Sequence, residues 1–163
     1  MIDTLFKPLA SGHPGSLDLV DDAAVLAPPA GCELVIAKDA MVEGVHFFPD
    51  DPPDSIAGKL MRVNVSDLAA MGADPLGYLL VVARSPHIDD VFLKGFAEGL
   101  ALDQEMFGLT LLGGDTVSTG GPLCLSLTIL GTVPTGQALR RSGASAGDEI
   151  WVSGTLGDAE IGL

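Results

Sequence analysis

The 163-residue sequence has few basic residues, few cysteines and no long uninterrupted apolar run. Eight Lys and Arg against 22 Asp and Glu give a formal net charge of −14, which disfavours nucleic acids and anionic membranes as partners. Cys32 and Cys124 lie far apart without a CxxC motif, so we expect two ordinary buried thiols and no disulfide framework. The first residues, MIDTLFKPLA, lack the basic start and long apolar core of a signal peptide. We therefore expect a cytoplasmic protein.

The motifs of several common enzyme classes are also missing. The Gly-Lys pair at Gly58-Lys59 is followed by leucine rather than Ser or Thr, so no P-loop is present, and no GxGxxG follows a strand. There is no GxSxG elbow, and the histidines lack HExxH spacing. These absences argue against P-loop and dinucleotide-binding enzymes, serine hydrolases and zinc peptidases.

The apolar content is sufficient for one folded unit. Hydrophobic residues make up 47% of the chain, the mean hydropathy is +0.42, and there is no internal repeat or low-complexity tract. Residue patterns predict strands at 21–27, 33–41, 75–83, 109–112, 123–129 and 149–153, and helices at 54–71 and 89–107, with turns at 28–31 and 113–116. Asp54 or Ser55 is the expected N-cap of the first helix. In the second helix Phe92, Phe96 and Leu100 are spaced i, i+4, i+8 and should share one side. The strand at 123–129 alternates apolar and more polar residues, so one of its faces should be buried. The apolar residues expected on one side of the first helix are Ile56, Leu60, Val63, Leu68 and Met71, and those expected on one face of the strand are Leu123, Leu125, Leu127 and Ile129.

This order of elements predicts an α/β (α+β) fold with a mixed β-sheet. Two main helices should cover one face, and the other face should be available to a partner subunit. The segment 155–163 resembles the start of another helix without a stop signal. We therefore expect a first domain at 1–153 and the start of a truncated second domain at 154–163.

Five aspartates interrupt apolar or glycine-rich sequence and suggest a shared divalent cation, because a buried carboxylate needs a positive partner. Asn64 and Asp67 are spaced i, i+3 on a helix that is otherwise apolar, where a cap or salt bridge is the alternative to a metal. The glycines beside Asp115 would let the backbone approach a bulky ligand, although a plain tight turn is the more ordinary interpretation of this stretch taken alone. The five aspartates are Asp21, Asp22, Asp39, Asp67 and Asp115.

Five stretches occur in the order found in the thiamine-monophosphate kinase family. They are DDAAVL (21–26), KDAMVEGVHF (38–47), NVSDLAAMGADP (64–75), LLGGDT (111–116) and LRRSGASAGDEIWVSGTLGD (139–158). The chain resembles this family over nearly its whole length, and EGVHF with NVSDLAAMGA is the most specific part. The family is one branch of the superfamily of aminoimidazole ribonucleotide synthetase, selenophosphate synthetase and the hydrogenase maturation dehydratase, which bind ATP without a P-loop.

The resemblance implies a phosphotransferase with a phosphate group as acceptor. The γ-phosphoryl group of ATP would pass directly to thiamine monophosphate, with several Mg²⁺ ions neutralising charge, which suits an acidic site. By motif, Asp22, Asp39, Asp67 and Asp115 resemble the metal ligands. Gly114, Asp115 and Arg141 resemble ATP contacts, and His46 resembles the residue that contacts the thiamine phosphate. Without the motif, His46 and Arg141 would be interpreted as ordinary structural and surface residues.

The sequence departs from the family pattern at two places. Ala37-Lys38 stands where relatives commonly have Thr or Ser before Asp39, and an ammonium group cannot ligate Mg²⁺. Either backbone carbonyls suffice there, or the charge of Lys38 replaces one ion. Leu19-Val20 replaces the usual glycine-rich approach to Asp21-Asp22.

The resemblance also implies a second α/β domain, which carries further metal ligands, and a homodimer formed through the N-terminal sheets. We therefore expect this chain alone to be inactive. Two alternatives remain open: a related ATP-using enzyme of the same superfamily that acts on another small substrate, or a dimerising Mg²⁺- and nucleotide-binding module without turnover.

Overall fold

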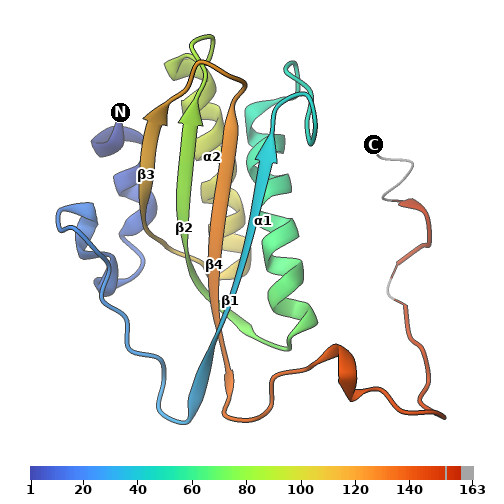
Figure 1. The fold of residues 1–163 in the computed structure, drawn as a ribbon. Helices are drawn as coiled ribbons and strands as arrows, with labels where there is room; N and C mark the ends of the chain where they lie inside the picture. The colour runs from blue at the N-terminus through green and yellow to red at the C-terminus, as the bar shows by residue number, and fades with distance from the viewer. Residues whose placement is uncertain (153, 159–163) are drawn as a thin grey trace.

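The computed structural model describes residues 1–152 and 154–158, and its centre is a four-stranded mixed sheet (Figure 1). The strands lie in the order β1-β4-β2-β3, and two long helices connect them. Three short helical segments, η1, η2 and η3, precede the sheet, and a fourth, η4, follows it. The bounds are η1 Ile2–Phe6, η2 Lys7–Ala10, η3 Pro14–Leu19, β1 Cys32–Val42, α1 Pro53–Ala70, β2 Asp74–Arg84, α2 Asp90–Phe107, β3 Leu111–Ser118, β4 Cys124–Pro134 and η4 Arg141–Gly143.

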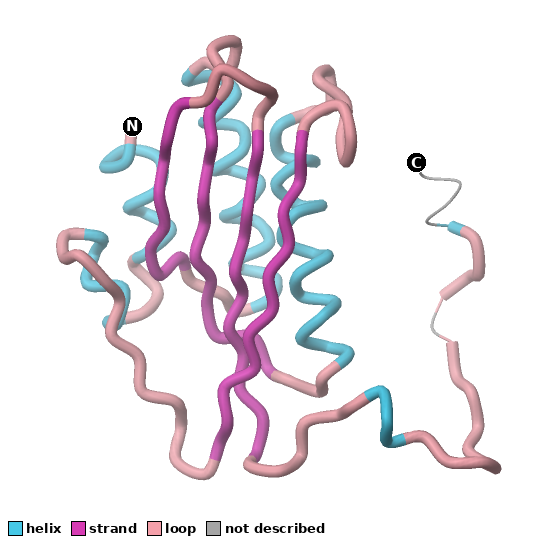
Figure 2. Tube along the Cα trace, viewed as in Figure 1, coloured by secondary structure: helices cyan, strands magenta, loops and turns pink. Residues whose placement is uncertain are grey.

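The strand pairing places both long helices on one face of the sheet. β4 pairs antiparallel with β1 and with β2, whereas β2 and β3 are parallel and are joined through α2. In Figure 2 both helices lie behind the sheet, and within the described part of the chain no helix covers its front face. The short segments η1 to η3 lie beside β3, at the left of Figure 1. The mixed sheet with two helices on one face confirms the predicted architecture.

The buried face of the sheet follows the alternation predicted for β4. Leu125, Leu127 and Ile129 are 0% exposed, and the residues between them are only half-buried. On β2, Tyr78 is also fully buried, and its hydroxyl donates to Gln104 Oε1 (2.8 Å). Burial raises the pKa of Tyr78 well above its ordinary value, so the phenol stays protonated and keeps this bond to α2.

The two long helices pack closely because α2 has glycine at the contact. A Cβ atom on Gly99 would lie 2.6 Å from the Asp54 Cα, so a larger residue would separate the helices. An ion pair also joins these two helices: the Arg62 guanidinium of α1 donates to both carboxylate oxygens of Asp103 of α2, at 3.0 and 2.9 Å. The side chain of Asp103 is 1% exposed, and this bidentate pair raises the pKa of Arg62.

Replacing Arg62 by methionine should leave the Asp103 carboxylate buried without a cation. We expect a loss of about 3 kcal/mol in the free energy of unfolding, at the low end for a broken buried pair because the Arg62 side chain is 60% exposed. Urea unfolding measures this loss. The double variant R62M/D103L should regain most of the lost stability. Equal stabilities of R62M and the wild type would show that the pair of Arg62 and Asp103 does not stabilise the fold.

Several predicted elements differ from the structure in the first half of the chain. Residues 21–27 form an irregular loop rather than a strand, because their backbone runs past β3 without pairing with it and is joined to Gly15 through Val25. The cap of α1 is Pro52, not Asp54 or Ser55, and Pro53 occupies the first helical position, where its missing N–H costs nothing. Val63, placed on the buried side by its spacing, is 37% exposed.

The second half contains further corrections. Residues 113–116 do not form a turn: β3 continues through them, paired with β2. Residues 149–152 are irregular rather than a strand, and residue 153 and most of the predicted helix at 155–163 lie outside the described residues. Cys32 and Cys124 are free thiols as expected but only partly buried.

None of the helices in the described residues has both the length and the apolar character needed to cross a membrane.

Candidate functional site

A cavity of about 570 Å³ lies between the loop at 20–27 and the edge strand β3. Both acids of the Asp21-Asp22 pair and residues 113–116 of β3 line it. Its apolar lining includes Ile2, Phe6, Leu26, Leu79, Leu80, Val82, Leu111, Leu112 and Leu130. Its volume is in the range of small-molecule sites, which combine apolar walls with a few polar groups.

Glycines give the cavity its two walls. The Val25 N–H donates to the Gly15 carbonyl (2.9 Å), and a Cβ on Gly15 would overlap the Val25 carbonyl oxygen, so the loop can return this close only with glycine there. On β3, a Cβ on Gly114 would overlap the Leu80 carbonyl oxygen of β2. Gly114 also has φ +155°, which side chains rarely adopt. The close approach of the backbone on both sides of the cavity therefore requires glycine at Gly15 and Gly114.

The acidic groups that line this cavity could hold a hard cation. Asp22 and Asp115 are both exposed, and their carboxylates come from opposite walls. Carboxylate oxygens are the ligands that Mg²⁺ prefers, and an ion held there would offset the charge of a polyphosphate. The structure thus brings together Asp22, Gly114 and Asp115, three of the residues selected from the sequence.

A second group of predicted residues lies at the opposite edge of the sheet. Asn64 of α1 is 0% exposed, and its Oδ1 accepts from the backbone N–H of Asp39 in β1 (3.1 Å). Its Nδ2 donates to the Leu60 carbonyl (2.9 Å). Asp67 is one turn further along and exposed. Asn64 does not point outward with Asp67 as its spacing suggested: its amide is bonded to the backbone and fixes Asp39.

Replacing Asn64 by leucine should release the Asp39 amide. We expect a loss of about 2 kcal/mol in the free energy of unfolding, since a buried N–H would lack an acceptor. Hydrogen exchange at the Asp39 amide should accelerate more than exchange in the centre of β4. Wild-type protection of Asp39 in N64L would show that Asn64 does not hold this strand.

The four candidate metal ligands do not surround one ion. Asp39 pairs with Leu127, whose side chain faces the helices, whereas Asp115 pairs with Val81 on the bare face. Three strand spacings, about 14 Å, separate the two edges of the sheet. Within the described residues no group of three or more His, Cys, Asp or Glu side chains is placed to hold a metal. The aspartates of this chain therefore form two separate groups, one at each edge of the sheet.

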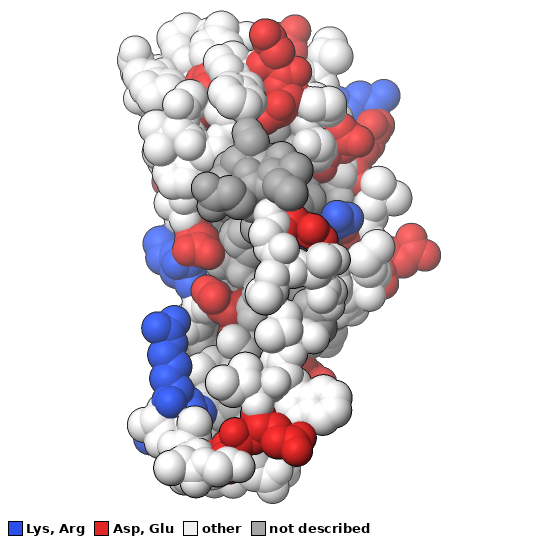
Figure 3. Space-filling view, turned by 90° about the vertical axis from the view of Figure 1, so that its right-hand side faces the viewer, with Lys and Arg blue, Asp and Glu red and all other residues white. Residues whose placement is uncertain are grey.

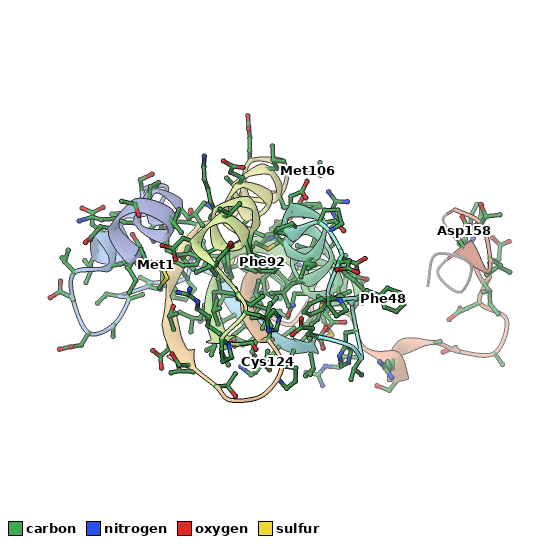
Figure 4. The ribbon with its side chains drawn as sticks, turned by 90° about the horizontal axis from the view of Figure 1, so that it is seen from above. Met1, Phe48, Phe92, Met106, Cys124 and Asp158 are labelled. Carbon is green, nitrogen blue, oxygen red and sulfur yellow. The ribbon has the colours of Figure 1, made fainter. Side chains whose placement is uncertain are left out.

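The remaining candidates, His46 and Arg141, lie outside the cavity. His46 is exposed in the turn that follows β1. Near it Phe48 is 66% exposed, and Figure 4 shows its ring at the periphery, pointing away from the sheet. Arg141 is exposed in η4, within the segment that leads away from the sheet in Figure 1.

Acidic side chains are spread over the whole side of the molecule seen in Figure 3.

Two acids have a larger place in the structure than the sequence gave them. The family motif leaves Asp21 out of the metal ligands, but Asp21 also lines the cavity. Glu43 was not selected, although its side chain is only 8% exposed and it interrupts an apolar strand end. The criterion used for the aspartates, an acid set in apolar sequence, would have identified Glu43 as well.

Comparison with known proteins identifies the domain and several relatives. Residues 20–133 match the family described as AIR synthase related protein, N-terminal domain. The thiamine-monophosphate kinase of Caulobacter vibrioides is 51% identical over 162 residues, which cover 99% of this chain and 46% of that protein. The chain therefore spans about half the length of the curated relatives it matches.

Solved structures agree in fold. The crystal structure of thiamine-monophosphate kinase from Stenotrophomonas maltophilia K279a has a TM-score of 0.80 at 44% identity, with 87% of this chain and 44% of that chain covered. A structure of AaThiL complexed with AMPPCP and TMP has a TM-score of 0.77 at 29% identity, with 87% and 45% covered.

Proposed function

The chain belongs to the AIR synthase related protein family, whose N-terminal domain it contains, and on this premise we propose that it is part of a thiamine-monophosphate kinase. The proposed reaction transfers the γ-phosphoryl group of ATP to the phosphate of thiamine monophosphate and yields thiamine diphosphate and ADP. The observation that carries the proposal is the cavity that Asp22, Gly114 and Asp115 line together. The names of the relatives and the complex of AaThiL with AMPPCP and TMP support it.

In this proposal the chain binds and orients phosphates rather than supplying a strong base. Asp22 and Asp115 would hold Mg²⁺ at the cavity, and Asp39 and Asp67 would serve a separate ion at the β1 edge. The ions would neutralise the charge that develops during phosphoryl transfer. The backbone at Gly114 would approach the nucleotide, Arg141 would contact its phosphates, and His46 would contact thiamine monophosphate.

We also propose a cytoplasmic homodimer. The face of the sheet not covered by the helices carries exposed apolar side chains, among them Leu34, Ile36 and Val117, and a second copy of the sheet would bury them. A second domain, beginning at about residue 154, would supply further metal ligands. Size-exclusion chromatography with light scattering tests the dimer: a purely monomeric full-length protein would contradict it.

Coupled detection of ADP release tests the activity. The full-length protein that contains this chain, supplied with ATP, Mg²⁺ and thiamine monophosphate, should turn over, and an inactive protein would refute the proposal. Activity with an aminoimidazole precursor or selenide instead would favour a related enzyme of the same family. Calorimetry on residues 1–163 with Mg²⁺ and an ATP analogue tests the alternative of a binding module without turnover. Binding by this chain, together with an inactive full-length protein, would support that alternative.

A further inference from the structure

The turn after β1 holds the His46 ring by its own backbone. The His46 N–H donates to the Val42 carbonyl (2.9 Å), and the Gly44 N–H donates to the Phe47 carbonyl (2.8 Å), with Gly44 at φ +77°. In return, the Val42 N–H donates to Nδ1 of His46 (3.1 Å). The Lys59 ammonium donates to the His46 carbonyl. The position of the ring is therefore set before any ligand arrives.

This geometry assigns the proton of the neutral ring. Since Nδ1 accepts from a backbone N–H, the proton of the neutral imidazole resides on Nε2. His46 is exposed, so this N–H is free to donate to an anionic oxygen outside the turn. The opposite tautomer would place two donors against each other at Nδ1.

The carboxylate of Glu43 ties this turn to two other segments of the chain. Its Oε2 accepts from the Leu123 N–H at the approach to β4 (2.9 Å), and its Oε1 lies 2.8 Å from His87 Nε2. The backbone N–H of Glu43 donates to the Leu123 carbonyl (3.0 Å). His87 is bonded in turn through Nδ1 to Ser85 Oγ (2.9 Å). A carboxylate that is 8% exposed thus fixes the residue next to Val42, whose N–H holds the His46 ring.

The Ser85, His87 and Glu43 chain is not a nucleophilic triad. Ser85 is 3% exposed, so its hydroxyl is closed to a substrate. It also meets Nδ1 of His87 while the acid meets Nε2, which reverses the arrangement of a serine hydrolase. What the chain of hydrogen bonds does is hold the ends of β1, β2 and β4 in register.

We propose that Glu43 is a positioning residue that keeps His46 as the Nε2–H tautomer, so that it presents one N–H donor to a phosphate oxygen of the substrate. The substrate part of this inference rests on the proposed function. The positioning part rests on the hydrogen bonds of Glu43, Val42 and His46 alone.

The first experiment needs no substrate. Nitrogen-15 NMR of histidine side chains, at a pH well above the ordinary histidine value of about 6.5, distinguishes protonated from unprotonated ring nitrogens. Wild-type His46 should give an unprotonated Nδ1 and a protonated Nε2. In E43A the two signals should move toward each other as the second tautomer becomes populated, and Val42 amide exchange should accelerate. E43Q keeps an oxygen that accepts from the Leu123 N–H and places an amide N–H against Nε2 of His87, which accepts it in the other neutral tautomer of that ring. E43Q should therefore restore the wild-type His46 signals.

The second experiment uses the full-length protein and ADP release. E43A should raise the KM for thiamine monophosphate about tenfold, the effect of one weakened hydrogen bond, and leave kcat and the KM for ATP within about twofold. E98Q is the matched control, because Glu98 is an exposed acid paired with Lys94 at 3.7 Å, and it should change neither readout. No turnover in the wild type would refute the proposed function, while the NMR result would still decide the role of Glu43.

Unchanged His46 signals and Val42 exchange in E43A would overturn the inference. Thermal unfolding checks that E43A folds. If it does not, H87A decides: His87 is 57% exposed and Glu43 keeps its bond to the Leu123 N–H, so we expect this variant to fold. H87A should move the His46 signals in the same direction by a smaller amount, and wild-type signals there would refute the network.

Discussion

Replacing Asp115 by asparagine should reduce turnover with ATP and thiamine monophosphate at least about a hundredfold, which is about 2.7 kcal/mol in the activation free energy. Asparagine keeps the size and one oxygen of the side chain but removes the charge that would hold Mg²⁺ at the cavity. Asp115 is exposed on β3, so its loss should leave the melting temperature within about 1 °C, the small effect of a surface substitution. Steady-state kinetics of the full-length protein over a range of Mg²⁺ concentrations measure the effect.

Glu105→Gln provides the control for net charge. Glu105 is exposed on α2, away from the cavity, and its replacement removes the same single charge. Turnover should not change in this variant. If D115N and E105Q had equal activity, Asp115 would have no role in metal or nucleotide binding.

Replacing Gly114 by alanine should destabilise the sheet more than the same replacement at the neighbouring Gly113. The new Cβ would overlap the Leu80 carbonyl oxygen of β2, and alanine would have to adopt φ +155°. The clash and the backbone strain together should cost about 3 kcal/mol or more. A chain of this size would then lose about 6–12 °C in melting temperature. Thermal unfolding followed by circular dichroism measures this loss.

Gly113→Ala is the matched control, one residue away on the same strand. A Cβ there would meet only Leu79 Cδ2, at 3.4 Å, which is an ordinary contact. Its melting temperature should fall by no more than about 3 °C, the effect of about 1 kcal/mol. Equal losses in the two variants would show that the close approach of Gly114 to Leu80 does not stabilise the sheet.

The elements that could be predicted are those whose pattern is local. The alternation of Leu125, Leu127 and Ile129 predicted one face of β4, and these three residues are 0% exposed. The spacing of Phe92, Phe96 and Leu100 predicted the buried side of α2: Phe96 and Leu100 are 0% exposed, and Phe92 is partly buried. A buried face needs apolar residues at the period of the element, so its pattern is visible in the sequence itself.

Residues 21–27 and 113–116 were assigned wrongly because their conformation depends on distant segments. The DDAAVLA stretch has a strand-like composition, but Val25 bonds to Gly15 rather than to a neighbouring strand. The GGDT stretch has the composition of a turn, yet β3 continues through it because Gly114 fits against Leu80 of β2. Which segment lies beside a glycine is a tertiary property, and glycine itself permits both outcomes.

The sequence by itself determined the family, the mixed sheet with two helices on one face, and the acidic residues that make a phosphate and magnesium site the natural hypothesis. Only the tertiary structure decided how these residues are grouped. It placed Asp22 with Asp115 in one cavity and Asp39 beside Asn64 at the other edge of the sheet. It also revealed Glu43 as the anchor of the His46 turn. The physical reason is that a side chain's type follows from the chain, whereas its neighbours follow from strand order and register.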